Sequence, residues 1–473
     1  MSWIEVSLFA LLIITLILLI INPFKKVTPF NYLAVATFAM MLSQMMYEMV
    51  RWQLYPTYFV VSMLFMSALI QLRAAKSATN KKLPNNREKQ IIVITIALLF
   101  SGSAMYAFPN YAISEPLGNY KIGTSTIEMT DTSRTEIYGD TNGDKRRIKV
   151  QFWYPAEVTK GFTRVKWLQD GLPVARALAK EMNLPFFTLD HTAKVMSHAF
   201  KDAPISEALE QYPIIVMSHG WTGFRNLHTD IAELLASHGY IVIGIDHTYG
   251  AQVVVFDEND IALLDHSALP DRDSTPDFLE YANRLVSTYA GDVQYVLDQL
   301  PDFNEGRYST QFINKLNLNT IGLIGHSTGG GADVMATIEG APVRALLGLD
   351  AWVEPIAPEL VEKGLNIPTL FLRSGQWEEG YNNANLLKIV STNANSKGLI
   401  QINGATHIDF SMAHMYSRLT EFVGFTGTIE QERLSQMQHE LILNFFEATM
   451  RDDEVFTLAP MLEKWDELEI INP

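Results

Sequence analysis

The chain opens with four apolar segments that short polar or charged stretches separate. They lie at about residues 6–24, 32–50, 57–72 and 90–108. A helix needs about 20 mostly apolar residues to cross the hydrocarbon core of a bilayer. The first and fourth segments meet this length, and the second and third lie near its lower end. The pattern predicts a region of four transmembrane helices over residues 1–108.

The hydrophobic pattern changes after a polar connector at residues 109–133. Two β-prone runs flank Asn142-Gly143, a dipeptide that is typical of a tight hairpin turn. From Tyr212 onward, continuous apolar runs alternate with amphipathic stretches, as expected for a parallel sheet covered by helices on both faces. We predict an α/β body with a doubly wound, mostly parallel sheet over residues 134–450, and an acidic C-terminal tail at 451–473.

Charge divides the chain at the same place. Residues 1–108 hold nine lysines and arginines and three acidic residues, which gives a net charge of +6. Because the whole chain has a net charge of −16, residues 109–473 together carry −22. An acidic body argues against nucleic acid as a partner. The chain has no cysteine, which excludes disulfides, thiolate metal sites and a cysteine nucleophile.

The basic residues between the apolar segments predict an orientation. Lys25 and Lys26 follow the first segment, Arg51 alone follows the second, and six basic residues follow the third at 73–89. Basic loops tend to stay in the cytoplasm, so the first and third loops are expected there. The prediction is a multi-pass protein of the cell membrane whose body, after residue 108, is extracytoplasmic.

One apolar run of the body ends in a motif with chemical meaning. Gly325-His326-Ser327-Thr328-Gly329 is a G-x-S-x-G sequence between an expected strand and an expected helix. The glycines allow a sharp turn that exposes the serine above the sheet edge. The helix N-terminus favours negative charge that develops there. We predict that Ser327 is a nucleophile and that the Thr328 amide donates to an oxyanion.

A nucleophilic serine needs a base and an acid that orients the base. In such sheets the chain order is serine, acid, histidine, and His407 is the later histidine that directly follows an expected strand. Two positions remain open for the acid. Asp350, at the end of the next strand, is favoured, and Glu378, after the strand beyond, is the alternative.

The second oxyanion donor is expected in the loop after an earlier strand. The sequence "SHGWTGF" ends such a strand, and the amide of Trp221 is placed to point toward the serine. The neighbouring His219 is interpreted as a turn residue without a catalytic role. Residues 140–144 resemble the start of a calcium loop, but Lys145 replaces the glycine that such a loop needs, so a hairpin is favoured.

Several of these segments together resemble a known family. "SHGWTGFRNLHTDIAELLASHGYIV", "GLIGHSTGGG", "LGLDAW" and "GATHIDF" are similar to platelet-activating factor acetylhydrolases of the plasma and type II intracellular kind and their bacterial relatives, over about residues 134–450. The resemblance implies an α/β-hydrolase fold and action on phospholipids with short or oxidised sn-2 acyl groups, without metal or cofactor. It maps the family's nucleophile, acid, base and oxyanion amides onto Ser327, Asp350, His407, Trp221 and Thr328.

The combined prediction is a membrane-anchored serine ester hydrolase that meets a lipid or small ester at a lipid bilayer. The apolar N-terminal region, residues 1–108, is not part of the familiar secreted enzyme. The segments at 156–205 and 250–280 are expected to line the site that binds the acyl group, and they show no clear match to the family. A general carboxylesterase or lipase of the same fold is therefore one alternative. A non-catalytic membrane receptor with a hydrolase-like body is another, and loss of the serine, histidine or aspartate would favour it.

Overall fold

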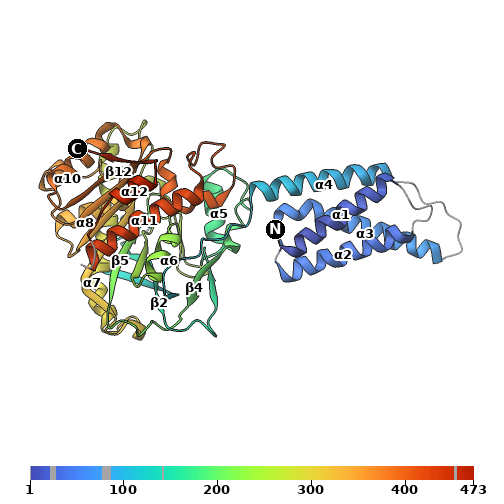
Figure 1. The fold of residues 1–473 in the computed structure, drawn as a ribbon, viewed down its shortest axis with the longest axis horizontal. Helices are drawn as coiled ribbons and strands as arrows, with labels where there is room; N and C mark the ends of the chain where they lie inside the picture. The colour runs from blue at the N-terminus through green and yellow to red at the C-terminus, as the bar shows by residue number, and fades with distance from the viewer. Residues whose placement is uncertain are drawn as a thin grey trace. The chain divides into compact units, whose positions relative to one another are not determined.

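The computed structural model describes residues 2–21, 28–48, 50–76, 87–140, 143–451 and 455–472. The chain forms two compact units (Figure 1). The first comprises Met1–Tyr111, Phe187–His191 and Tyr416–Leu419, and the second comprises Ala112–Phe186, Thr192–Met415 and Thr420–Pro473. Each unit has an apolar core of its own, so each is described by itself.

Four helices make up most of the first unit. They are α1 (Trp3–Ile21), α2 (Thr28–Tyr47), α3 (Tyr55–Lys76), which follows the short 3₁₀ helix η1 (Trp52–Leu54), and α4 (Arg87–Ala107). Apolar side chains such as Leu12, Val61 and Ile94 are buried among them, while Phe59 and Leu99 are more than half exposed. Helices that are apolar on all sides are typical of a membrane environment.

Among the described residues, three helices are long and apolar enough to cross a membrane, namely Trp3–Ile21, Trp52–Arg73 and Arg87–Ala107. The expected second span, α2, is not one of them. It carries the polar residues Asn31 and Gln44, both of which are buried inside the unit. The structure therefore supports three candidate spans, and the count of four stays a prediction.

The basic residue of the second loop is not solvated. Arg51 is 3% exposed, and its Nη1 donates to Glu5 Oε1 at 3.0 Å while its Nη2 donates to Phe108 O at 3.3 Å. Buried charges are tolerated when they are paired in this way. The basic residues of the other two loops lie partly outside the described residues, at 22–27 and 77–86, so the orientation also stays a prediction.

The second unit is built on an 11-stranded sheet with the order β13-β12-β11-β10-β9-β5-β6-β2-β1-β4-β3. Strands β5 (Tyr212–Ser218), β6 (Ile241–Asp246), β9 (Leu316–His326), β10 (Ala345–Leu349), β11 (Thr369–Ser374) and β12 (Ser396–Ile402) run parallel. The remaining strands are β1 (Lys121–Thr135), β2 (Lys145–Ala156), β3 (Arg164–Lys166), β4 (Met196–Lys201) and β13 (Leu468–Ile471). Separately, β7 (Val253–Val255) pairs with β8 (Ile261–Leu263).

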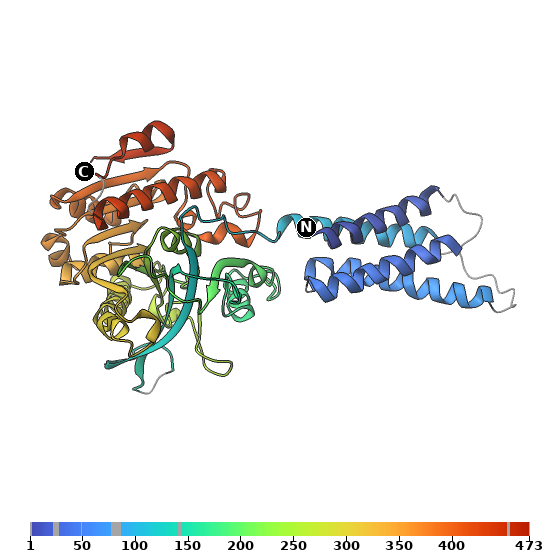
Figure 2. The same ribbon diagram turned by 60° about the horizontal axis from the view of Figure 1, so that its bottom comes forward.

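Helices cover both faces of this sheet (Figures 1 and 2). One apolar core holds side chains of α7 (Phe278–Asn304), α8 (Thr328–Glu339), α9 (Pro358–Lys363) and α10 (Gly380–Thr392), and the other holds side chains of α6 (Thr229–Ser237), α11 (Gln431–Met450) and α12 (Ala459–Lys464). A further helix, α5, spans Leu172–Glu181. This doubly wound arrangement confirms the predicted fold class, because strands that are buried on both faces must be apolar throughout.

The sheet is wider than the sequence predicted. Strand β1 lies mostly within the expected connector and pairs antiparallel with β2, so the predicted hairpin begins earlier in the chain than expected. Residues 141–142 of its turn lie outside the described residues. The expected C-terminal tail supplies α12 and edge strand β13, which pairs antiparallel with β12. Met461, Trp465 and Leu468 are buried in the core, and this burial holds an otherwise acidic segment on the sheet.

Candidate active site

Ser327 alone makes the turn from β9 into α8. Its backbone has φ 52° and ψ −120°, a conformation that costs about 1–3 kcal/mol for a residue other than glycine. Three backbone hydrogen bonds hold the turn: Ser327 N donates to Leu349 O at 3.0 Å, and Ser327 O accepts from Gly331 N at 3.0 Å and Trp352 N at 2.8 Å. A strained serine at the junction of a strand and a helix is the geometry that G-x-S-x-G predicts.

The outer glycines of the motif permit close approaches of backbone to backbone. A Cβ on Gly325 would lie 2.6 Å from the nitrogen of Gly330, and a Cβ on Gly329 would lie 2.5 Å from the oxygen of Ser218. Both distances are shorter than Cβ atoms tolerate. Any larger residue would therefore push the start of α8 away from β9 and β5.

The three predicted catalytic side chains form one hydrogen-bonded chain. His407 Nε2 lies 2.9 Å from Ser327 Oγ, and His407 Nδ1 lies 2.7 Å from Asp350 Oδ2. An ionised carboxylate only accepts hydrogen bonds, so the proton of a neutral imidazole belongs on Nδ1. Nε2 is then free to accept the hydroxyl proton of the serine, as a general base requires.

The structure brings one of the two candidate acids to His407. Asp350 is buried at the end of β10, where Oδ1 accepts from Ser374 N at 2.9 Å and Oδ2 accepts from Ser374 Oγ at 2.8 Å. Glu378 is exposed, and its Oε1 accepts from Gln401 Nε2 at 2.6 Å. Within the described part of the chain, no hydrogen bond joins Glu378 to His407.

Three further side chains hold His407, and sequence reasoning missed all of them. Gln376 Oε1 accepts from His407 N at 2.7 Å, and the ring of Trp377 stacks on the imidazole at 4.5 Å. His326 Nε2 donates to His407 O at 3.0 Å. Gln376 and Trp377 directly precede Glu378, and His326 directly precedes Ser327, so adjacency to the motifs was the available signal.

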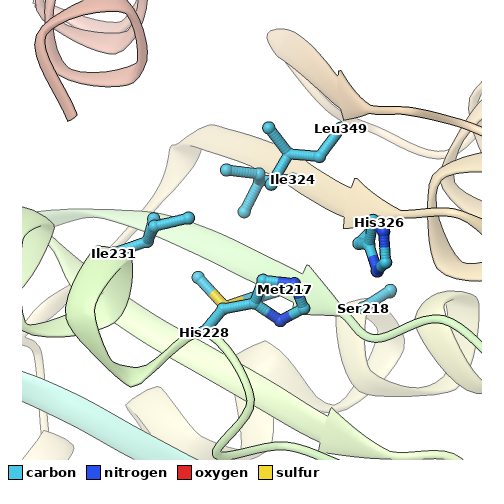
Figure 3. A pocket seen from close by; sticks show the side chains of 7 residues that line it. All are labelled: Met217, Ser218, His228, Ile231, Ile324, His326 and Leu349. Atoms are coloured by element: carbon cyan, nitrogen blue, oxygen red, sulfur yellow. The ribbon is translucent and has the colours of Figure 1, made fainter. Parts of the chain in front are cut away.

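The ring of His326 lies beside that of His407, with centroids 4.7 Å apart, and it is uncharged at neutral pH. Figure 3 shows a small, mostly apolar pocket that His326 and His228 line together with Met217, Ser218, Ile231, Ile324 and Leu349. Burial lowers the pKa of His228 to about 4, and burial together with His407 lowers the pKa of His326 well below its usual value. An uncharged His326 would not repel a positive charge on His407.

Two backbone amides are available beside the nucleophile. A Cβ on Gly220 would lie 2.9 Å from Ser327 Cβ, so the loop that carries Trp221 passes directly against the serine. Thr328 is the first residue of α8, where the helix dipole favours negative charge. Among the described residues, neither the Trp221 nor the Thr328 amide has a hydrogen-bond partner, which leaves both able to donate to an oxyanion.

Comparison with known proteins agrees with this arrangement. A solved structure described as a ferulic acid esterase from Streptomyces cinnamoneus superposes with a TM-score of 0.61 at 23% identity, covering 76% of this chain and 99% of that one. At this identity the likeness shows the fold alone. It supports the α/β-hydrolase architecture that the strand order and the Ser327 turn indicate.

Three relatives carry related descriptions. "Platelet-activating factor acetylhydrolase" of Canis lupus familiaris is 28% identical over 43% of this chain and 48% of its own length, and that of Gallus gallus is 24% identical over 64% and 74%. A "Probable 1-alkyl-2-acetylglycerophosphocholine esterase" of Arthroderma benhamiae is 23% identical over 61% and 72%. The chain thus spans about half the length of the canine relative.

A family model covers much more of the chain than these pairwise matches. It is described as "Platelet-activating factor acetylhydrolase, isoform II" and matches residues 105–468. The matched range contains the whole Ser327–His407–Asp350 chain of hydrogen bonds and extends through α12 into edge strand β13. The protein therefore belongs to the platelet-activating factor acetylhydrolase family, isoform II.

Proposed function

We propose that this protein is a membrane-anchored serine ester hydrolase that cleaves short-acyl esters, and that phospholipids with short or oxidised sn-2 acyl groups are its natural substrates. The observation that carries the proposal is the continuous hydrogen-bonded chain from Ser327 through His407 to Asp350. A receptor with a hydrolase-like body would not need this chain, so its presence favours catalysis over simple binding.

The geometry suits acyl transfer in two steps. His407 Nε2 takes the proton of Ser327 Oγ as that oxygen attacks the ester carbonyl carbon, and the Trp221 and Thr328 amides donate to the resulting oxyanion. Asp350 remains ionised and stabilises the imidazolium. His407 then gives its proton to the leaving alkoxide, which departs as an alcohol and leaves Ser327 acylated.

The second step releases the acid. Water attacks the acyl carbon of the ester on Ser327, with His407 as the base, and the same two amides receive the second oxyanion. The bond from carbon to Ser327 Oγ breaks, and His407 returns the proton to the serine. The products are a carboxylic acid and the free enzyme, so the cycle needs no metal or cofactor.

The family membership and the membrane region support the choice of substrate. The fungal relative's description names a 1-alkyl-2-acetylglycerophosphocholine esterase. Three apolar helices suit a chain held at a bilayer, where an amphiphilic ester is abundant. Ser327 is 9% exposed, so little of its surface is accessible, which favours a small acyl group over a long one.

Labelling with a fluorophosphonate tests the catalytic assignment directly. We expect the probe to modify Ser327, located by mass mapping, and expect Ser327→Ala and His407→Ala each to lower kcat on p-nitrophenyl acetate by at least about 10⁴. The exposed Ser391→Ala on α10 serves as the control and should keep wild-type labelling. A Ser327→Ala protein within tenfold of wild-type activity would overturn the proposal.

A further inference from the structure

The loop that carries Trp221 contains a buried histidine whose contacts go beyond a turn. We propose that His219 is a positioning residue that fixes the Gly220–Trp221 peptide so that the Trp221 N–H faces the oxyanion. The inference rests on the proposed function, since it concerns the same reaction. It revises the interpretation of His219 as a residue that only shapes the turn.

The contacts of His219 determine which ring nitrogen carries the proton. His219 Nε2 lies 3.2 Å from the backbone nitrogen of His247, and that N–H can only donate. Nε2 is therefore the acceptor, and the proton of the neutral ring sits on Nδ1, 2.7 Å from Gly220 O. Burial and the nearby His247 lower the pKa of His219 well below its usual value, so this tautomer persists through neutral pH.

A donor on Gly220 O controls the direction of the next amide. The Gly220 carbonyl and the Trp221 N–H belong to one peptide group, which is trans, so they point in opposite directions. Gly220 O accepts from His219 Nδ1 and also from Gly223 N, at 2.9 Å. With the oxygen held from one side, the N–H points to the other, and the Gly220 backbone lies against Ser327.

The residue that His219 contacts, His247, is held by a network of buried side chains. The ring of His247 stacks on Tyr289 with centroids 3.8 Å apart, and its Nδ1 lies 3.0 Å from Asp292 Oδ2. Asp292 in turn accepts from Arg146 Nη2 at 2.6 Å, and every one of these side chains is buried. His219 thus links the loop to this buried network. The loop contains two glycines, whose conformational freedom would otherwise allow the Gly220–Trp221 peptide to rotate.

This role affects the transition state more than the bound ester. The oxyanion carries more negative charge than the ester carbonyl, so a misdirected N–H costs most when the tetrahedral species forms. Loss of a whole oxyanion donor lowers kcat by about 10²–10³. Because Gly223 N still holds Gly220 O, removal of the His219 donor should lower kcat by about 10- to 100-fold, with KM within about threefold.

Two substitutions of similar size separate this role from a merely structural one. In His219→Asn the side-chain amide nitrogen takes the place of Nδ1 and keeps the donor to Gly220 O, but the contact with His247 N is lost. In His219→Gln the longer amide keeps an acceptor for His247 N but loses the donor to Gly220 O. We expect the Gln variant to show the kcat loss and the Asn variant to stay within about fivefold of wild type.

The assay is p-nitrophenyl acetate hydrolysis together with inhibition by a short-chain trifluoromethyl ketone, which forms a tetrahedral oxyanion on the serine. The inhibition constant should rise in His219→Gln by the same factor as kcat falls. His238→Asn replaces a half-buried histidine at the end of α6 whose Nδ1 also lies within hydrogen-bond distance of a backbone carbonyl, Leu234 O at 2.8 Å, and should change kcat less than threefold.

The outcomes separate this inference from the proposed function. Equal activity of the two His219 variants, a more active Gln variant, or a kcat loss without a rise in the inhibition constant would overturn the positioning role. Hydrolysis that persists in Ser327→Ala would overturn the proposed function instead. Hydrolysis that depends on Ser327 and shows the ranking wild type, Asn, Gln supports both.

Discussion

The choice of Asp350 as the acid predicts the effect of a single-atom change, Asp350→Asn. Asp350 Oδ1 accepts from the backbone N–H of Ser374, which can only donate, so the amide oxygen of the asparagine must occupy that position. The amide nitrogen then faces His407 Nδ1 in place of Oδ2. Because this nitrogen donates, Nδ1 must accept, and the imidazole proton moves to Nε2, where it blocks proton transfer from Ser327.

The size of the effect follows from the tautomer. Replacing the orienting aspartate by asparagine in a serine triad leaves the geometry intact and lowers kcat by about 10⁴, equivalent to about 5.5 kcal/mol of transition-state stabilisation. The fold should survive, because Asp350 has φ +44° and asparagine tolerates positive φ well. The Ser374 hydroxyl can also rotate to accept from the new amide nitrogen.

The measurement is kcat on p-nitrophenyl acetate for Asp350→Asn and for the matched control Glu378→Gln. Glu378 is exposed and bonded to Gln401, so its variant should lose less than about tenfold. Thermal midpoints of both variants establish that they are folded. A folded Asp350→Asn protein that is more active than Glu378→Gln would refute the tautomer argument and place the acid after β11.

Three other expectations can be checked independently. On p-nitrophenyl esters, rates should peak at about two to six acyl carbons, each buried methylene adding up to about 0.8 kcal/mol until the site is full; rates still rising at twelve to sixteen carbons indicate a lipase. In intact cells, an impermeant maleimide should label Ser309→Cys and not Ser77→Cys, and the reverse pattern inverts the predicted orientation. Burial raises the pKa of Glu233 to about 7, whereas a glutamate in the unfolded chain has a pKa of about 4.3. The stability of the wild type should therefore fall relative to that of Glu233→Gln as pH rises from about 5 to 7. Thermal midpoints of the two proteins that stay a constant distance apart over this range would contradict the argument.

Local sequence patterns were enough to predict the parts of this protein that depend on near neighbours. Continuous apolar runs determine strands that are buried on both faces, and the spacing of glycines around Ser327 determines a sharp turn, since both are set within about ten residues. The apolar helices of the N-terminal region, residues 1–108, were equally easy to predict from the sequence. Its second helix was less so, because polar residues such as Gln44 are buried inside the unit and lower the hydropathy of α2.

Features that depend on distant pairing needed the tertiary structure. The segment that ends the chain reads as an acidic tail, yet Leu468 pairs with Ile402 at the sheet edge. A short edge strand has too few residues to show a clear hydrophobic pattern, and it forms only because it pairs with the neighbouring strand. The same is true of β1, because its many polar residues made the segment resemble a connector rather than a strand that pairs with β2.

The site shows the same division between local and distant information. Sequence order and strand ends indicated Ser327 and His407 but left Asp350 and Glu378 both open, because each follows a strand at the same edge of the sheet. Which carboxylate reaches the imidazole depends on how the two loops fold over that edge, and only Asp350 is buried against His407. The role proposed for His219 likewise rests on a backbone amide 28 positions away, a contact that no local pattern specifies.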